Sequence, residues 1–118
     1  MPDVTVSLTK VIGNKFCTAS DDGDKVHAAI VEAISRGDRV QISFEGVEDL
    51  TSAFLNAAVG QLYGEFAEDK LRSVLLPPVG ASAEDLALLK RVVDRAKDFF
   101  QDPERFRRAA REESENAD

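Results

Sequence analysis

Residues 40–66 read VQISFEGVEDLTSAFLNAAVGQLYGEF and contain a clear succession of strand, loop and helix signals. In residues 40–44 apolar side chains alternate with polar ones, which is the period of a half-buried β-strand. Residues 45–49 are acidic and contain a glycine, which is typical of a tight loop. Over residues 51–66 apolar side chains recur every three or four positions, and this spacing predicts a helix.

Segments on both sides carry signals of the same kinds. Alternation in residues 4–9 predicts a strand, and the turn dipeptide Gly13-Asn14 predicts a hairpin to a second strand at residues 15–18. Acidic residues followed by an apolar stripe predict a helix over residues 21–37. Residues 73–76 predict a short strand, which ends at two prolines because proline cannot donate to a sheet ladder.

The C-terminal third predicts one long helix and a polar end. Ser82 and Asp85 approximate a capping box, in which side chains bond to backbone N–H groups at a helix start. The stripe expected to be buried on this helix is Leu86, Leu89, Val93, Ala96 and Phe100. We expect further helical turns at residues 104–111, anchored by Phe106, and a disordered polar tail at residues 112–118.

The predicted order is strand, strand, helix, strand, helix, strand, helix. Helices between strands imply right-handed crossovers and parallel pairing. The sequence therefore predicts a small α/β domain over residues 1–111, with a mostly parallel or mixed sheet of about four strands and helices packed mainly on one face. The wide apolar helix faces would also allow a homodimer.

Charge narrows the classes of partner. The chain has 15 Lys and Arg against 22 Asp and Glu, a net charge of −7. Binding to nucleic acid or to an anionic membrane is therefore not expected, because both need a basic surface. No apolar run approaches the roughly 20 residues of a membrane span, and no signal peptide is recognisable. The cytoplasm is the expected location.

Side chains suited to catalysis are few. The chain has one cysteine, Cys17, and one histidine, His27, which together match a nucleophile and its base in residue type alone. The carboxylates at residues 21–24 fit a helix start and those at residues 45–49 fit a solvated loop, so no metal site is expected. No glycine-rich phosphate loop follows a strand, and no cofactor is expected. These features predict a protein that is not an enzyme.

The segment quoted first resembles the STAS domain family, and more closely the bacterial STAS-like domains of unknown function. The resemblance covers most of the chain, to about residue 106, and is carried by Ile-Ser-Phe at 42–44, Gly-Val at 46–47, Leu-Thr-Ser at 50–52, and the runs 54–58 and 60–64. It implies a regulatory module. STAS domains bind partner proteins and are best known as antagonists of anti-sigma factors, where the partner is a serine kinase of the histidine-kinase-like ATPase type.

In that family the kinase's target is a serine at the start of this helix. The resemblance places Thr51 on the usual aspartate, Ser52 on the residue before the phosphoacceptor, and Ala53 on the phosphoacceptor itself. Phosphorylation at the family position is thus excluded here. Thr51 and Ser52 are the candidate phosphorylation sites, although helix capping already explains both hydroxyls.

From these features we expect a non-enzymatic regulatory module that docks a protein partner through the strand–loop–helix junction, residues 45–56. A basic groove on a histidine-kinase-like ATPase or serine kinase would complement its carboxylates. The alternative is a small-molecule or nucleotide sensor, and an enzyme using Cys17 and His27 is the least favoured reading. The expected partner-binding residues are Glu45, Glu48, Asp49, Thr51, Ser52 and Asn56.

Overall fold

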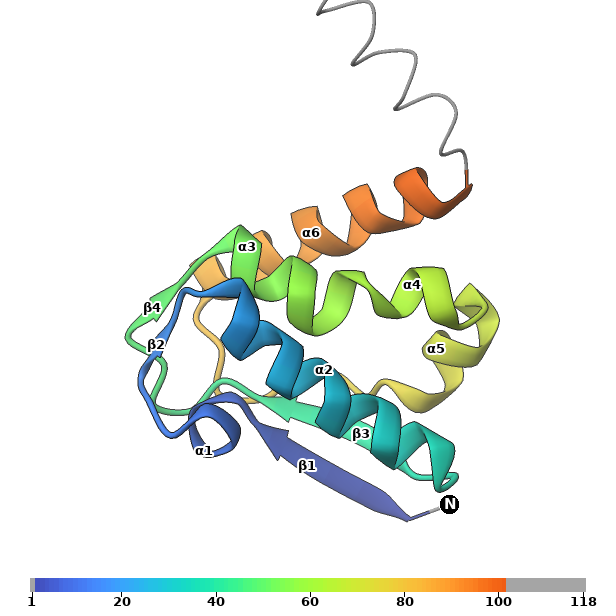
Figure 1. Ribbon diagram of the computed structural model, residues 1–118, viewed down its shortest axis with the longest axis horizontal. Coiled ribbons are helices and arrows are strands. Elements are labelled where there is room, and N and C mark those ends of the chain that lie inside the picture. The colour runs from blue at the N-terminus through green and yellow to red at the C-terminus, as the bar shows by residue number, and fades with distance from the viewer. Residues whose placement is uncertain (1, 102–118) are drawn as a thin grey trace, which may run out of the picture.

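The computed structural model describes residues 2–101 and shows a mixed α/β fold in which helices dominate (Figure 1). The elements are β1 (Asp3–Ser7), α1 (Leu8–Ile12), β2 (Phe16–Cys17), α2 (Ser20–Ser35), β3 (Arg39–Ser43), β4 (Asp49–Leu50), α3 (Ser52–Leu55), the π-helix η1 (Asn56–Gly60), α4 (Leu62–Glu65), α5 (Glu68–Val74) and α6 (Ala83–Gln101).

Two small parallel sheets take the place of the single sheet of about four strands. β1 pairs with β3 in parallel, with Val6 opposite Ile42. β2 and β4 form a separate two-residue parallel ladder. On its other side β3 makes isolated parallel bridges to Leu75 and Val79. The prediction of parallel pairing is confirmed, but the strands are fewer per sheet and shorter than expected.

The predicted N-terminal hairpin is wrong. Residues 8–12 form α1, because the Ser7 hydroxyl accepts a hydrogen bond from the Lys10 N–H at 3.3 Å and so caps a helical turn. Gly13 ends this turn in the left-handed conformation, with φ of 71°. The chain then enters β2, which pairs with β4 and not with β1.

The first two residues of the strand predicted at residues 73–76 are the end of α5, a helix that the sequence analysis did not predict. Leu71 and Val74 are buried at helical spacing, and Arg72 lies 3.4 Å from Glu68 one turn earlier. The two prolines then prevent a continuous ladder, so that only single bridges to β3 remain.

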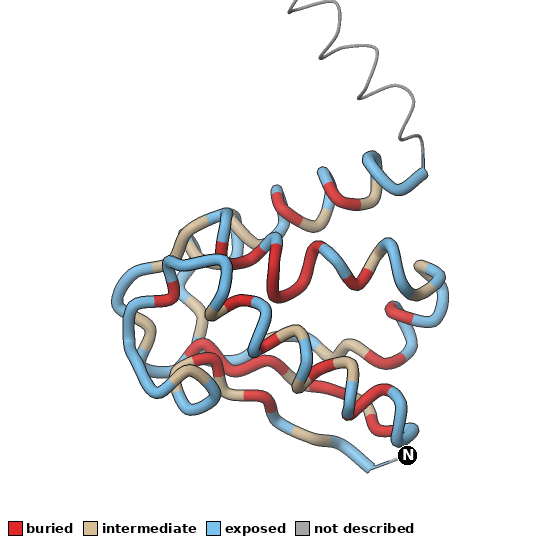
Figure 2. Tube along the Cα trace, in the orientation of Figure 1, coloured by how far each residue is buried: buried red, intermediate tan, exposed pale blue. Residues whose placement is uncertain are grey.

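The main helices lie on one side of the β1–β3 sheet and form successive layers (Figure 1). α2 packs on the sheet, η1 makes its most extensive contacts with α2, and α6 packs on α3, η1 and α4. Buried residues gather between these layers (Figure 2). The helix-facing residues of the strands, such as Val6, Val40 and Ile42, are buried, whereas Thr5 on the other face is exposed.

The outermost helix, α6, buries less of its stripe than the sequence predicted. Val92 and Ala96 are buried, but Leu86 and Phe100 are exposed. The reason is that α6 packs on one layer of helices and has a narrow contact face. The helical turns predicted at residues 104–111, and the tail predicted at residues 112–118, lie outside the described residues.

Gly23, near the start of α2, lies directly against α3–η1. A Cβ atom at this position would lie 2.5 Å from the Phe54 carbonyl oxygen and 2.7 Å from the Ala57 Cβ. Both distances are shorter than van der Waals contact, and the first obstacle is backbone. Gly23 therefore sets how closely α2 and α3–η1 can pack.

We expect Gly23→Ala to destabilise the fold. Helix propensity alone would favour alanine by about 1 kcal/mol, but overpacking in a closed core costs about 1–3 kcal/mol. Because the nearest obstacle is backbone, we expect the upper end of the overpacking cost. Urea unfolding should then show a net loss of about 2 kcal/mol, against less than about 0.5 kcal/mol for Lys25→Ala on the exposed side of α2. A more stable Gly23→Ala protein would contradict the close packing.

Candidate functional site

The strand–loop–helix junction, residues 45–56, is tied to the rest of the fold by backbone hydrogen bonds. β4 lies within it and pairs with β2. The Glu48 N–H donates to the Lys15 carbonyl at 3.0 Å, and the Thr51 N–H donates to the Cys17 carbonyl at 3.1 Å. The junction is therefore an ordered surface whose shape is fixed by a segment far away in the sequence.

The acidic side chains of the junction are exposed. Glu48 lies 3.5 Å from the Lys15 ammonium, and both side chains are more than half exposed, so solvent screens the pair. Neither Glu45 nor Asp49 has an ion-pair partner among residues 2–101. The junction thus presents negative charge that this part of the chain does not neutralise.

The two hydroxyl residues of the junction differ in what they do. Thr51 is the N-cap: its Oγ1 donates to the Thr18 carbonyl at 2.7 Å and accepts from the Phe54 N–H at 3.2 Å. Ser52 is exposed, and its hydroxyl makes no hydrogen bond within the described range. Of the two candidate phosphorylation sites, Ser52 is accessible and Thr51 is occupied by a structural role.

Thr51→Ala should therefore lower the free energy of unfolding by about 1–2 kcal/mol, because it removes a helix cap. It also removes the tie to Thr18. Ser52→Ala should change this free energy by less than about 0.5 kcal/mol, since the side chain is exposed. Urea unfolding of the two variants measures the difference, and equal losses would contradict the assignment of the cap.

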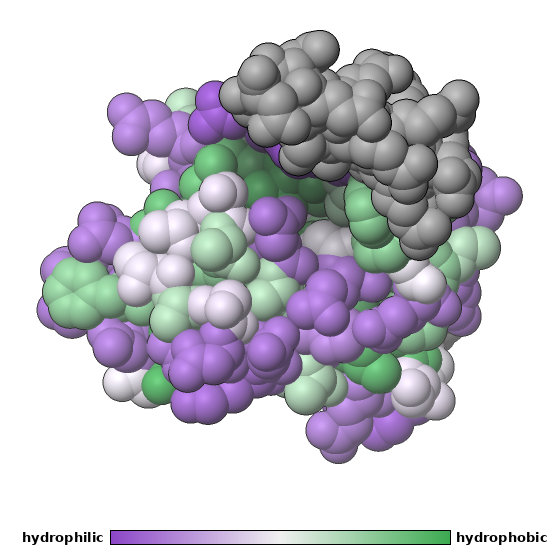
Figure 3. Space-filling view, turned by 45° about the horizontal axis from the view of Figure 1, so that its top comes forward, coloured by the Kyte–Doolittle hydropathy of each residue, from purple (hydrophilic) through white to green (hydrophobic). Residues whose placement is uncertain are grey.

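A groove runs between α3–η1 and α6, and two of the predicted site residues line it. It consists of adjoining cavities of about 490 Å³ and 450 Å³ that share Asn56 and Arg95. On the face that carries α6, Figure 3 shows an apolar hollow edged by hydrophilic residues. The first cavity is lined by Ser52, Asn56, Leu88, Arg91, Val92 and Arg95. The second is lined by Asn56, Gly60, Gln61, Arg95, Ala96, Phe99 and Phe100.

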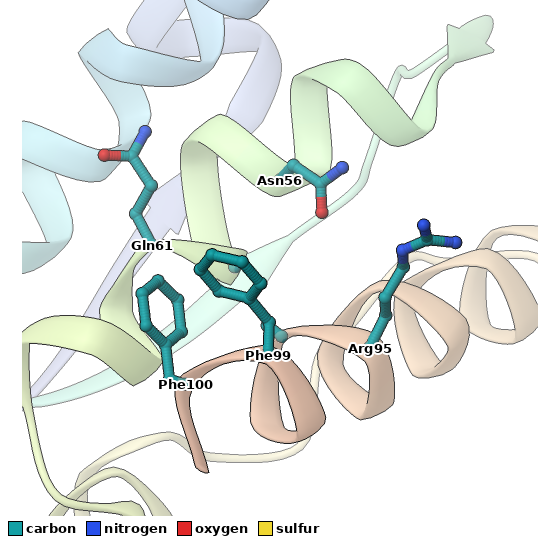
Figure 4. A pocket seen from close by; sticks show the side chains of 7 residues that line it. Asn56, Gln61, Arg95, Phe99 and Phe100 are labelled. Atoms are coloured by element: carbon teal, nitrogen blue, oxygen red, sulfur yellow. The ribbon is translucent and has the colours of Figure 1, made fainter. Parts of the chain in front are cut away.

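The α6 side of the groove carries residues that the sequence analysis did not predict as part of the site. Arg95, Phe99 and Phe100 project from α6 toward the helix that bears Asn56, whereas Gln61 turns away (Figure 4). Gln61 instead donates from its side-chain amide to Asp24 of α2 at 3.2 Å. A basic and aromatic wall of α6 therefore faces α3–η1.

Arg91 and Arg95 are one helical turn apart, a spacing that places both on the same side of α6. Neither has a carboxylate partner in the part of the chain that the structure describes. By contrast, Lys90 of the same helix pairs with Asp94 at 2.8 Å, and this hydrogen bond raises the pKa of Lys90. The groove thus has a cationic end in an acidic protein.

The helix bordering the groove contains a π-turn. The Gln61 N–H donates to the Asn56 carbonyl at 3.1 Å, five residues back, in place of the usual four. At Gly60 a Cβ would lie 3.7 Å from Val92 and Ala96, which is ordinary van der Waals contact, so the π-turn packs directly on α6. Such π-turns occur frequently at functional sites.

The structure therefore divides the predicted site between two surfaces. Ser52 and Asn56 line the groove opposite the arginines. The carboxylates of Glu45, Glu48 and Asp49 are not among the groove-lining residues and form a separate acidic surface on the loop.

A model of one protein family, described as a STAS-like domain of unknown function (DUF4325), matches residues 22–81, just over half of the chain. The chain belongs to this family. The STAS-like match contains the junction and the π-turn, and it ends before α6. The comparisons found no matching curated protein and no matching solved structure.

The thiol of this STAS-like domain lacks the properties of a nucleophile. Cys17 is fully buried, and burial raises its pKa to about 11, with smaller contributions from Asp22 and Asp85. The thiol therefore stays protonated at neutral pH. His27 lies beside Glu65. Its Nε2 is 2.8 Å from Glu65 Oε1, in an orientation that makes no hydrogen bond.

The raised pKa of Cys17 predicts a change of stability with pH. The unfolded thiol loses its proton near pH 9.0 and the folded one near pH 11, so between these values the folded state binds more protons. The contribution of Cys17 to the free energy of unfolding is therefore complete below pH 9 and is lost as the pH rises toward 11. The stability difference between wild type and Cys17→Ala should shrink across this window in urea unfolding, and a constant difference would contradict the buried thiol.

Two further classes of site find no support within residues 2–101. No group of three or more His, Cys, Asp or Glu side chains is arranged to hold a metal ion there. In the same range, no helix is both long enough and apolar enough to cross a bilayer.

Proposed function

We propose that this STAS-like domain is a non-enzymatic, cytoplasmic regulatory module that docks a protein partner through the junction at residues 45–56. The observation that carries the proposal is an acidic surface held in a fixed shape. Glu45 and Asp49 are exposed and without an ion-pair partner among the described residues, while the backbone around them is bonded to β2. A basic patch on a partner would complement this surface and speed association.

Ser52 is the residue through which docking could be regulated. Its hydroxyl is exposed and directly follows the capping residue, so a kinase could reach it without breaking the cap. A phosphate there would add about two negative charges next to the docking surface. A serine kinase of the histidine-kinase-like ATPase type, which the family resemblance implies, is therefore the partner class that we propose.

The burial of Cys17 supports a binding role over catalysis. A nucleophilic cysteine needs a depressed pKa and access to substrate, and this thiol has neither.

Charge reversal at the junction tests the proposal. Wild-type protein and a Glu48→Lys/Asp49→Lys variant are used as baits in chemical crosslinking in lysate of the source organism, followed by quantitative mass spectrometry. The proposal predicts a partner that crosslinks to residues 45–56 of the wild type and is recovered about tenfold less with the variant, because charge reversal replaces attraction by repulsion.

A Glu84→Lys/Asp98→Lys variant is the matched control, since it makes the same change of charge at exposed positions of α6. It should recover the partner as well as wild type. If both variants recover the partner equally poorly, the loss is due to net charge alone and docking at the junction is refuted. Crosslinks confined to other surfaces would refute it too.

A further inference from the structure

We infer that the groove between α3–η1 and α6 binds an acidic, partly apolar peptide segment of the partner protein, with Arg91 and Arg95 receiving its carboxylates. This inference rests on the proposed docking function and adds a second contact with the opposite charge. Two walls line the groove, and the wall formed by α6 lies outside the residues that the family model matches.

Charge is the first argument. In a chain of net charge −7, Arg91 and Arg95 lie one helical turn apart, and no carboxylate within residues 2–101 neutralises them. Arg91 and Arg95 both line the cavity of about 490 Å³, next to Ser52 and Asn56. Guanidinium groups pair with carboxylates through two parallel hydrogen bonds, so carboxylates are the groups that this wall is suited to bind.

The apolar end of the groove is the second argument. Phe99 and Phe100 are 41% and 40% exposed, and their rings meet edge to face with centroids 5.0 Å apart. With Ala96 and Gly60 they line the cavity of about 450 Å³. Large apolar side chains exposed together and edged by polar residues mark binding sites on protein surfaces. A ligand with carboxylates alone would leave this end empty.

The length of the groove favours a peptide over a compact small molecule. Arg91 and Phe99 are eight positions apart on α6, which corresponds to about 12 Å along the helix axis. An extended chain covers that distance in about four residues. The expected segment therefore carries acidic residues and, about four residues away, a large apolar side chain.

Polar groups on the opposite wall can hold the peptide backbone. The hydroxyl of Ser52 and the side-chain amide of Asn56 line the groove and make no hydrogen bond within the described residues. They can donate to and accept from the main chain of a segment whose side chains point to α6. A carboxylate placed at Ser52 would instead occupy the arginines.

An NMR titration of the full chain tests the inference. The probe is a capped synthetic peptide with two adjacent glutamates and a leucine four residues after them. Arginine Nε–Hε signals of Arg91 and Arg95 and backbone amides of Ser52 and Asn56 should shift, and Arg91→Gln/Arg95→Gln should weaken binding by about tenfold or more. Ser52→Asp should also weaken it, because the new carboxylate competes for the arginines.

The matched control is Arg72→Gln/Lys90→Gln, which removes two exposed cations that already pair with Glu68 and Asp94. It should change the affinity by less than about twofold, since surface charges act weakly at a distance. Equal weakening in both double variants would overturn the inference. So would binding of inorganic phosphate or glutarate as tight as that of the peptide, because the site would then serve a small anion.

A further outcome would also overturn it. If Arg91→Gln/Arg95→Gln moves the signals of residues 112–118 without peptide, the groove belongs to the acidic end of this same chain. A negative titration would not refute docking at the acidic loop, because that proposal depends on Glu48 and Asp49 and is tested separately by crosslinking.

Discussion

The close contact between α2 and α3–η1 determines where Ser52, Asn56 and the groove lie. Gly23 lets the backbone at Phe54 approach α2 to a distance that any side chain would prevent. That approach fixes the first turn of the helix that carries Ser52 and Asn56, and hence one wall of the groove. α6 then packs on the outside of the same helix. A change in this one contact would move the start of α3 and the groove together.

The electrostatics of the domain follow from this layering. The net charge of −7 is not spread evenly. The loop presents carboxylates, whereas the outermost helix presents to the groove two arginines that have no carboxylate partner within residues 2–101. A partner that binds both surfaces needs a basic patch for the loop and an acidic segment for the groove. Two such contacts of opposite sign discriminate against partners that carry only one of them.

The sequence predicted what depends on local pattern and missed what depends on packing between distant segments. The strand at Val40, a helix cap at Thr51 or Ser52, and the parallel pairing followed from alternation, capping chemistry and element order. The pairing of β2 with β4 could not, because residues 16–17 give no sign of which of several strands they will meet. The helical spacing of Leu71 and Val74, with Glu68 four residues before Arg72, was the available signal for α5.

The groove shows the same division between local and distant information. The spacing of Arg91 and Arg95 beside the buried Val92 and Ala96 was visible in the sequence, but their meeting with Ser52 and Asn56 depends on the packing of α6 on η1.

Hydrogen exchange of the domain, free and in complex with its captured partner, tests the central claim of docking at the junction most directly. The account predicts added protection at residues 48–56. Protection confined to the outer face of the β1–β3 sheet, with the junction unchanged, would contradict it.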